Sequence, residues 1–525
     1  REKDQWGEEF CFINNGVKIF AMGANYIPED QIVTRCNEEK TRKLLADCKA
    51  ANYNFIRVWG GGYYPDEYFY DYCDENGIIV WQDFMFACSA YLLTEEFEET
   101  VRGEVRDNVI RLRNHPSLGL WCGNNEIESA WEYWGLPEDE EAKRDYLIIF
   151  EDIIPQVLKA YDPCENTFYW PSSPSSGGGF KDASSNHAGD MHYWDVWHNF
   201  KPIEAFREFY YRFCSEYGFE SLPDIKTCRA FADETKGDFD LCSPVMAAHQ
   251  KCVQGNEKIM YYLAQMVRYP YDFKQLIYSS QLVQADCIRS NVEHMRRARG
   301  RCMGSAYWQV NDSNPVISWS SIDYFGRWKG LHYYAKRFYA PCLISCDDTH
   351  RKKPVLNISN ERMTAFEGIV RWKLRNNKAE ILQSGEKSVS VPALTAQNVL
   401  DIDLSQELVS RTDPREKYLE YSIMENGKVL SFGTTLFVRP KEFTFLEPAI
   451  TYGISESEDN FALTFCAENY AKSVCLSLKT ADCVFSDNWF DIHGKEPVTI
   501  MIDKASLSRK MTAQELSEEL EIMHN

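Results

Sequence analysis

The amino-acid sequence predicts an α/β protein, a TIM (β/α)8 barrel followed by two small β-sandwich domains of the immunoglobulin-like class. Two patterns support this prediction. From Lys18 to about Gly330, short apolar runs alternate with longer amphipathic stretches, as in repeated β–α units. Beyond Tyr334, apolar and polar residues alternate with a period of two, which is typical of half-buried strands. A chain of 525 residues also exceeds what one core supports, so two or three domains are expected.

Eight apolar runs account for the barrel strands, and amphipathic stretches account for the helices between them. The predicted strands are residues 18–25, 54–59, 78–84, 117–122, 166–171, 189–194, 212–216 and 303–309. The predicted helices are 40–51, 66–76, 95–114 and 143–161, with a long helical insertion at 258–299. In a parallel barrel the chemistry lies on the loops that follow the carboxyl ends of the strands.

The remaining third of the chain reads as antiparallel β structure. Strands are predicted at 364–375, 379–389, 399–408, 418–424 and 429–438, and the alternation resumes over 443–503. Asn426-Gly427 is a hairpin-turn signal between the last two strands of the first group. Thr512 and Glu515 predict a capping box at the start of a short final helix. The domains expected are 1–340 for the barrel, 341–440 for the first β-sandwich and 441–525 for the smaller second one.

Composition excludes several classes of partner. The net charge of −22 disfavours nucleic-acid binding, because a phosphate backbone would be repelled. No run approaches 18 apolar residues, so no membrane span is expected. The 18 cysteines lack zinc-type spacing and predict mostly unbridged thiols in a reducing compartment. Acidic composition fits a cytoplasmic enzyme, although the chain starts without Met and reads as part of a longer protein. The oligomeric state stays open.

Two glutamates provide the strongest functional signal. Glu126, in Trp121-Cys-Gly-Asn-Asn-Glu-Ile127, and Glu216, in Arg212-Phe-Cys-Ser-Glu-Tyr-Gly218, each follow or end a short apolar run. They are 90 positions apart, which leaves room for three further strand–helix units. A barrel glycosidase needs two such carboxyl groups, one protonated to release the aglycone and one ionised to attack the sugar. Solvated loop residues and a structural ion pair are the competing interpretations.

The neighbours of these glutamates suggest supporting roles. Asn125 could hydrogen-bond the 2-hydroxyl of a sugar, and Arg57 is a plausible partner that would keep Glu216 ionised. The three glycines 60–62 after the second strand match neither a dinucleotide fingerprint nor a P-loop, so they more plausibly make room for substrate. The Ser/Gly-rich segment 171–179 predicts a flexible loop at the mouth of the barrel.

Aromatic and histidine residues also follow predicted strands. His192 and Trp194 end the sixth strand, and Trp308 ends the eighth, where it could form a floor beneath a sugar or simply belong to the core. His187 lies near His192, but no helical i, i+4 pair of metal ligands is present. Neither a metal nor a cofactor is expected.

Taken together, these segments resemble glycoside hydrolase family 2, and within it the β-mannosidases. The strings that carry the resemblance run in family order along the barrel: Gly23-Ala-Asn-Tyr-Ile-Pro28, Phe55-Ile-Arg-Val-Trp-Gly-Gly-Gly62, Trp81-Gln-Asp-Phe84, Asn114-His-Pro116, Cys122-Gly-Asn-Asn-Glu126, Arg212-Phe-Cys-Ser-Glu-Tyr-Gly218 and Tyr307-Trp-Gln-Val-Asn-Asp312. Phe485-Ser-Asp-Asn-Trp-Phe-Asp491 resembles the last β domain of the family.

The resemblance implies a retaining exo-β-mannosidase that acts on a glycoside or oligosaccharide. Glu126 would be the acid/base and Glu216 the nucleophile. The residues expected to bind the terminal mannose are Asn125, Trp59, Arg57, Trp134, His192, Trp194 and Trp308.

One departure from the family and several alternatives qualify this expectation. Family members normally carry two β domains before the barrel, which this chain lacks, so weakened activity is expected of the chain by itself. An endo-β-mannosidase, a β-galactosidase, a β-glucuronidase and an exo-glucosaminidase use similar frames. A non-catalytic carbohydrate-binding protein is the alternative from a different class.

Overall fold

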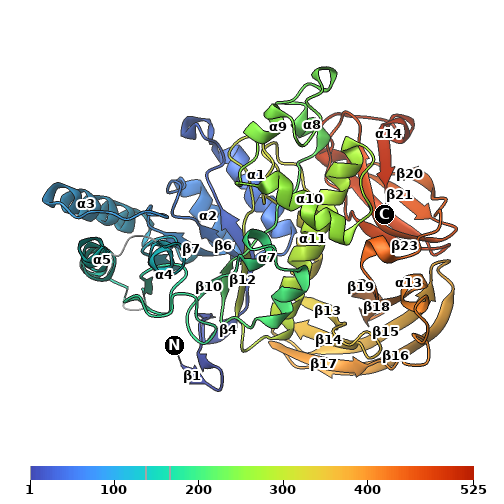
Figure 1. Ribbon diagram of the computed structural model, residues 1–525, viewed down its shortest axis with the longest axis horizontal. Coiled ribbons are helices and arrows are strands. Elements are labelled where there is room, and N and C mark those ends of the chain that lie inside the picture. The colour runs from blue at the N-terminus through green and yellow to red at the C-terminus, as the bar shows by residue number, and fades with distance from the viewer. Residues whose placement is uncertain (1, 136–138, 165–166) are drawn as a thin grey trace. The chain divides into compact units, whose positions relative to one another are not determined.

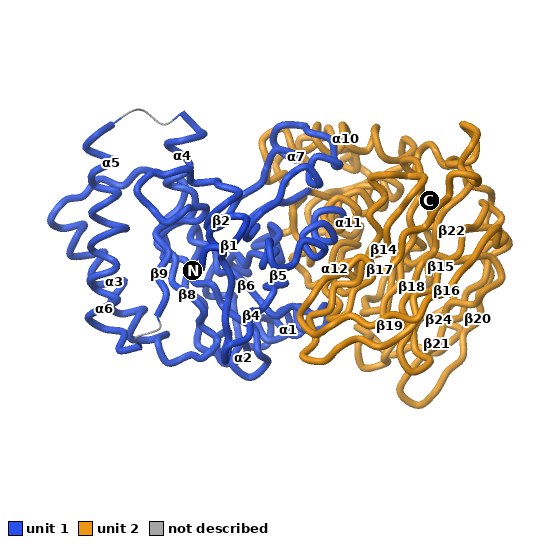
Figure 2. The backbone as a smooth tube through the Cα atoms, turned by 90° about the horizontal axis from the view of Figure 1, so that it is seen from below, with its two compact units in different colours: residues 1–219, 290–314 blue, residues 220–289, 315–525 orange. Residues whose placement is uncertain are grey.

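The computed structural model describes residues 2–135, 139–164 and 167–525 (Figure 1). The chain divides into two compact units, which Figure 2 distinguishes by colour. The first comprises residues 1–219 and 290–314, and the second comprises residues 220–289 and 315–525. The domain boundaries 1–340, 341–440 and 441–525 expected from the sequence stay predictions.

The first unit contains an eight-stranded parallel sheet, which confirms the predicted fold class. Its strands are β5 (Ala21–Tyr26), β6 (Phe55–Val58), β7 (Ile79–Asp83), β8 (Leu118–Cys122), β9 (Tyr169–Trp170), β10 (Met191–His192), β11 (Cys214–Glu216) and β12 (Gly304–Tyr307). They are ordered β10-β11-β12-β5-β6-β7-β8-β9, and an isolated bridge between Ser175 and Asp190 links the segments that follow β9 and precede β10. Each of the eight predicted runs overlaps one of these strands; Asn166, the first residue of the fifth run, lies outside the described residues.

The curled sheet encloses a solid core of side chains. Phe55, Trp81, Trp170 and Phe213 belong to one buried cluster, and Phe10 from the amino-terminal segment packs among them. The Phe10 ring lies 4.8 Å from the Trp170 ring and 5.7 Å from the Phe213 ring, measured between centroids. Side chains therefore fill the interior, as expected for a barrel of this size, and the open space must lie at its ends.

Helices follow most strands of the sheet. In this unit they are α1 (Glu38–Ala50), α2 (Glu67–Asn76), α3 (Glu95–Leu112), α4 (Ile127–Tyr133), α5 (Glu140–Leu147), α6 (Ile154–Tyr161) and α7 (Asp195–His198). Asn37 and Thr94 cap α1 and α3 by accepting hydrogen bonds from the third helical N–H. The predicted helix 143–161 starts earlier, at the cap Asp139, and a π-helical turn (Ile148–Ile153) joins α5 to α6.

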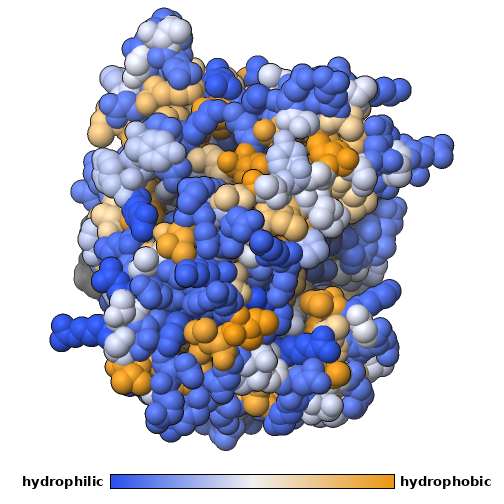
Figure 3. All heavy atoms as spheres, turned by 90° about the vertical axis from the view of Figure 1, so that its right-hand side faces the viewer, coloured by the Kyte–Doolittle hydropathy of each residue, from blue (hydrophilic) through white to orange (hydrophobic). Residues whose placement is uncertain are grey.

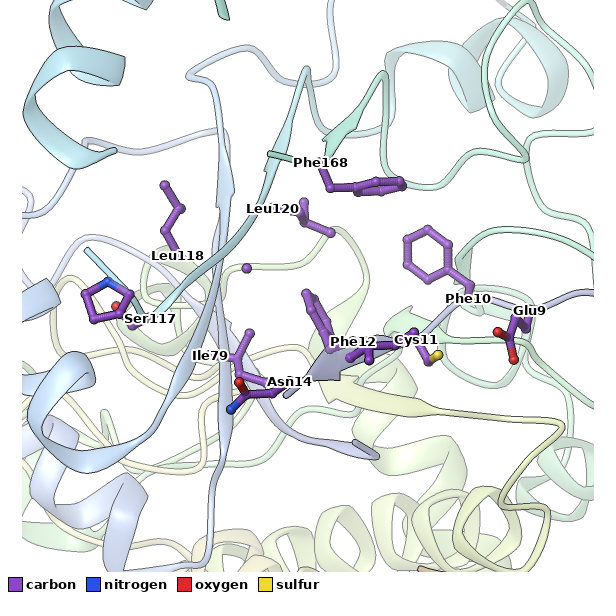
Figure 4. Close-up of a pocket in the computed structure, with 13 residues that line it drawn as sticks. Glu9, Phe10, Cys11, Phe12, Asn14, Ile79, Ser117, Leu118, Leu120 and Phe168 are labelled. Atoms are coloured by element: carbon purple, nitrogen blue, oxygen red, sulfur yellow. The ribbon is translucent and has the colours of Figure 1, made fainter. Parts of the chain in front are cut away.

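A short hairpin, β3 (Phe12–Asn14) and β4 (Val17–Ile19), precedes the first barrel strand; still earlier come β1 (Lys3–Asp4) and β2 (Gly7–Glu8). A cavity of about 440 Å³ lies beside the hairpin (Figure 4), bordered by Phe10, Phe12 and Phe168 and by residues at the amino ends of β7 and β8. This cavity is therefore at the opposite end of the strands from Glu126 and Glu216, and neither glutamate borders it.

The helical insertion is interrupted. It consists of α10 (Gly255–Met266) and α11 (Phe273–Arg297), the latter contributing to both units, instead of one continuous stretch. Pro270 lies in the gap, and proline cannot donate the backbone hydrogen bond that a helix interior requires. The second unit also contains α8 (Ile225–Cys228), α9 (Pro244–Ala248), α12 (Gly330–Phe338), α13 (Asp413–Glu416) and α14 (Ala513–Glu519).

The rest of the second unit is antiparallel, as predicted. Its sheets contain β13 (Cys342–Asp347), β14 (Val355–Asn360) and β17 (Thr395–Asp401); β15 (Phe366–Asn376), β16 (Ile381–Val391), β18 (Lys417–Glu425) and β19 (Lys428–Leu436); β20 (Thr451–Glu456), β21 (Asn460–Cys466) and β24 (Val498–Asp503); and β22 (Tyr470–Leu478), β23 (Phe490–His493) and β25 (Leu520–Met523). The predicted strand 399–408 is wrong beyond Asp401, where β17 ends and the chain leaves the sheet. The capping box of Thr512 and Glu515 is confirmed.

Hydropathy varies over the surface in small patches. On the face in Figure 3, hydrophilic side chains predominate, and hydrophobic ones form small groups separated by them. Within the described part of the chain, no helix combines the length and the hydrophobicity needed to cross a bilayer.

Candidate active site

The carboxyl ends of the barrel strands gather the predicted site residues. Arg57 lies in β6, His192 and Glu216 are the last residues of β10 and β11, and those two are register partners in the parallel ladder. Asn125 and Glu126 follow β8 directly. The sheet therefore brings the two glutamates, which are far apart in the sequence, to one edge, as the strand assignment predicts.

Glu126 is held in a strained turn. It is the residue before α4 and has φ 62° and ψ 9°, a left-handed conformation that is unusual for a residue other than glycine. Its backbone N–H donates to the carbonyl of Ser173 (2.8 Å), and the N–H of Asn125 donates to the carbonyl of Phe86 (2.9 Å). The turn is thus anchored on both sides, which aims the Glu126 side chain; strain of this kind is often found at functional sites.

Arg57 is the centre of the site. Its fully buried guanidinium donates to Glu216 Oε1 (2.6 Å), to Asn125 Oδ1 (2.7 Å) and to Asn25 Oδ1 (2.9 Å). It also donates from Nη2 (2.8 Å) and Nε (3.3 Å) to the two carboxylate oxygens of Asp83. Only the planar fork of arginine provides this many fixed donors, so lysine could not replace it. Arg57 therefore pairs with Glu216, as expected from the sequence.

The two glutamates differ in their partners. Burial raises the pKa of both carboxyls, and in each case the positive charge of Arg57 opposes that shift. Glu216, however, receives the short hydrogen bond from Arg57, whereas Glu126 contacts His192 Nδ1 (2.8 Å) and the thiol of Cys88 (3.6 Å). The geometry therefore stabilises a negative charge on Glu216 more strongly than on Glu126.

His192 lies between the two carboxyl groups. Its Nδ1 is 2.8 Å from Glu126 Oε1 and 3.4 Å from Glu216 Oε2, and its side chain is only 3% exposed. Burial lowers the pKa of His192 to about 4. The imidazole is therefore neutral near pH 7 and can donate only one hydrogen bond.

Spacing alone would allow a metal ion at two places in the described residues. Ligand atoms of Glu126, His192 and Glu216 lie within 4.8 Å of one another, as do those of Asp71, Asp74 and His115. In the first group the Arg57 cation already neutralises Glu216, which reduces the need for a metal. The expectation that the protein needs no metal stays a prediction.

The predicted aromatic residues occupy different surroundings. Trp59 and Trp308 follow β6 and β12, and their rings meet edge to face with centroids 5.0 Å apart. Trp134 follows α4 and is 51% exposed, and Trp194 packs against His198 at 5.0 Å. The substrate-binding roles assigned to all four stay predictions.

Two interpretations from composition need correction. A Cβ on Gly60 would lie 2.8 Å from the Phe84 carbonyl, so this glycine makes room for neighbouring backbone, and its N–H donates to Asp83 (3.0 Å). The segment 171–179 contains Ser173 and Ser175, which are fully buried and hydrogen-bonded to Asp190. Composition suggested flexibility because it does not show that these hydroxyls have a buried carboxylate as partner.

Sequence reasoning did not single out four residues of this network. Asn25 is the next-to-last residue of β5 and Asp83 is the last residue of β7, so their position near strand ends was an available signal. Ser173 and Asp190 offered none, because they lie in irregular segments whose contacts depend on the barrel closing.

Comparisons with known proteins cover both parts of the chain. Residues 353–442 match the family described as Mannosidase Ig/CBM-like domain, and residues 445–525 match an Ig-fold domain family. Over 529 residues the chain is 32% identical to β-mannosidase B of Aspergillus terreus, covering 95% of this chain and 62% of that protein. It is 35% identical to β-mannosidase of Capra hircus over 361 residues, covering 64% of this chain and 40% of that protein.

Solved structures show the same relationship. The β-D-mannosidase of Dictyoglomus thermophilum superimposes with a TM-score of 0.90 at 30% identity, over 100% of this chain and 62% of that one. The exo-chitosanase of Amycolatopsis orientalis, with a TM-score of 0.72 and 16% identity, shares the fold. The chain thus spans about 62% of the length of the first curated relative and of the first solved structure.

Proposed function

Because the chain is a homologue of the β-mannosidases, which are glycoside hydrolases, we propose that it carries the catalytic site of a retaining exo-β-mannosidase. Its substrate would be a glycoside or oligosaccharide with a terminal, non-reducing β-D-mannose. The observation that carries the proposal is the pair of carboxyls, since an oxygen of Glu126 and one of Glu216 lie within 4.8 Å. Retaining enzymes hold these groups roughly 5–5.5 Å apart, against about 6.5–9.5 Å in inverting ones.

In the first step Glu216 would act as nucleophile. Its carboxylate oxygen forms a bond to the anomeric carbon while the bond from that carbon to the leaving oxygen breaks. Glu126 gives its proton to the leaving oxygen, so the aglycone departs as a neutral alcohol. Arg57 keeps Glu216 ionised beforehand, because its Nη1 donates to Oε1 at 2.6 Å.

In the second step the roles of the acid/base reverse. Glu126, now ionised, takes a proton from water, and the water oxygen attacks the anomeric carbon. The bond to Glu216 breaks, mannose leaves with retained configuration, and both carboxyls return to their initial states. Asn125, which accepts from Arg57 at 2.7 Å and is thereby oriented, is positioned to bond the 2-hydroxyl of the sugar.

Trapping the covalent intermediate tests this proposal. The chain is incubated with a 2-deoxy-2-fluoro-β-mannosyl fluoride, whose fluorine slows breakdown of a glycosyl-enzyme, and intact mass and peptide mapping follow. One adduct on Glu216 is expected, with none in Glu216→Gln. An adduct on another carboxyl, or labelling with the galactosyl or glucosyl reagent instead, would contradict the assignment.

The same reagents address the remaining alternatives. An endo-β-mannosidase would require sugar on both sides of the cleaved bond, so aryl mannosides would react poorly and an internal linkage well. A carbohydrate-binding protein without catalysis would bind mannosides but form no adduct. Since the chain spans only part of its relatives, the longer natural protein is the second sample, and labelling there alone would indicate that residues outside this chain complete the pocket.

A further inference from the structure

Asp190 is a buried carboxylate with four groups that can donate to it. Its Oδ1 accepts from Trp170 Nε1 (2.8 Å) and from the N–H of Ser175 (3.0 Å). Its Oδ2 accepts from the hydroxyls of Ser173 (2.6 Å) and Ser215 (2.5 Å). An indole N–H and a backbone N–H can only donate, and an O–O separation near 2.6 Å requires a proton between the oxygens. Trp170 Nε1 and the N–H of Ser175 occupy Oδ1, so with Asp190 as the carboxylate both serine hydroxyls give their single proton to Oδ2.

That assignment determines the state of His192. The Oγ of Ser173 is also 3.0 Å from His192 Nε2. With its proton committed to Asp190, Ser173 can only accept there, so Nε2 must carry the hydrogen. A neutral imidazole holds one hydrogen, which leaves Nδ1 as an acceptor. The 2.8 Å contact between Nδ1 and Glu126 Oε1 then needs its proton from the carboxyl group.

We infer that Ser173 and Asp190 are positioning residues that hold His192 in its Nε2–H tautomer and thereby place the resting proton on Glu126. The inference rests on the proposed function and deepens it, because it explains which of two neighbouring carboxyls is loaded as the acid. Without such a device, two buried carboxyls this close would share the proton according to small differences in their surroundings.

The charged groups that face this chain of hydrogen bonds agree with the assignment. Glu216 Oε2 lies 3.4 Å from Nδ1, but the other Glu216 oxygen accepts from Arg57, which keeps this carboxyl as the ionised one. No lysine or arginine among the described residues forms an ion pair with Glu126, and burial raises the pKa of the adjacent Cys88 thiol to about 12, so this group stays neutral. The rival arrangement is an imidazolium that donates to both glutamates.

Nuclear magnetic resonance reads the tautomer directly. The chain is labelled with ¹⁵N at both imidazole nitrogens, and long-range proton–nitrogen correlations are recorded near pH 7; the His192 signal is the one lost in His192→Gln. The inference predicts one pyrrole-type nitrogen at Nε2 and one pyridine-type nitrogen at Nδ1. An imidazolium, or hydrogen on Nδ1, overturns it.

Two matched serine variants test the role of the hydroxyl. Ser173→Ala and Ser215→Ala each remove one hydroxyl that donates to Asp190 Oδ2, but only Ser173 contacts His192. We expect Ser173→Ala to shift His192 toward the Nδ1–H tautomer and Ser215→Ala to leave the tautomer unchanged. Equal spectra for both variants would overturn the role of Ser173. If neither variant folds, the spectrum of the unmodified chain still decides the tautomer.

Leaving groups provide the kinetic readout. A 2,4-dinitrophenyl mannoside needs no proton to depart, whereas a methylumbelliferyl mannoside does. Ser173→Ala should lower kcat/KM for the second about tenfold or more relative to the first, since general acid catalysis contributes ~10²–10⁴. A merely structural effect would lower kcat/KM for both substrates equally and would overturn the inference.

Failure of this inference can be told apart from failure of the proposed function. The spectra report the tautomer without any turnover, whereas failure of the proposed function is seen as the absence of an adduct with any reagent.

Discussion

Replacing Arg57 by Met tests whether one buried cation holds this site together. Met keeps much of the side-chain volume but removes five hydrogen bonds and the charge. Asp83 is fully buried and the Glu216 side chain is 5% exposed, so both carboxylates would be left without a cation where water cannot replace it. Breaking a buried pair in this way costs about 3–5 kcal/mol. Because domains are stable by only about 5–15 kcal/mol, the loss should be obvious.

A second buried arginine provides the control. Arg375 is 2% exposed in the antiparallel unit, but its partners Glu420 and Glu496 are 20% and 49% exposed, so water can solvate them once the arginine is gone. Arg375→Met should therefore cost only about 1–2 kcal/mol. The contrast between the two variants comes from the exposure of the partners, since both arginines are equally buried.

Urea denaturation followed by tryptophan fluorescence measures the two losses, with urea chosen because it does not screen charge. Hydrogen exchange of peptides that cover β5 and β6 assigns the loss to the barrel, which matters because a chain with two units need not unfold in one step. Asp83→Asn in the Arg57→Met background should recover at least about 1 kcal/mol by removing the orphaned charge. A loss below about 1 kcal/mol for Arg57→Met, or no recovery, would refute the reasoning.

Two further predictions concern titratable groups near the site. Cys88 is exposed, yet desolvation by the surrounding protein raises its thiol pKa to about 12, so iodoacetamide should alkylate it at least about tenfold more slowly than the exposed Cys242; equal rates at the two cysteines by peptide mass spectrometry would contradict this. Glu128 accepts from the N–H of Phe180 (2.8 Å), and burial raises its pKa to about 7. A raised carboxyl pKa means that the folded chain binds the proton more tightly than the unfolded one, so its contribution to stability is present below about pH 4.5 and is lost as pH rises toward 7. Glu128→Gln keeps the acceptor and should raise Tm at pH 8 more than at pH 5; an unchanged pH dependence of Tm would show that Glu128 is not the titrating group.

Most strands and helices of the barrel could be predicted because they depend on local sequence patterns. Alternating apolar runs predicted all eight barrel strands, and a strand assignment places Glu126 and Glu216 at carboxyl ends without any knowledge of distance. The predicted helix boundaries were less accurate where a single residue interrupts a helix. Pro270 does so in the helical insertion, which it divides into α10 and α11. The strand predicted at 399–408 failed beyond Asp401 because the apolar–polar alternation continues there although the chain has left the sheet.

The sequence by itself determined which residue types stand at the ends of which strands. Hydrophobic periodicity locates the strands, and the end of each parallel strand locates its last residues at the carboxyl edge of the sheet. Only the tertiary structure decided which of those side chains touch. The buried Arg57 bonds residues from four strand ends or the turns after them, and Asp190 bonds Ser173 and Ser215, which are 42 positions apart in the chain. Such contacts depend on closure of the sheet and on exclusion of water, which turns weak polar preferences into obligatory hydrogen bonds. Neither closure of the sheet nor exclusion of water can be read from a short segment of the sequence.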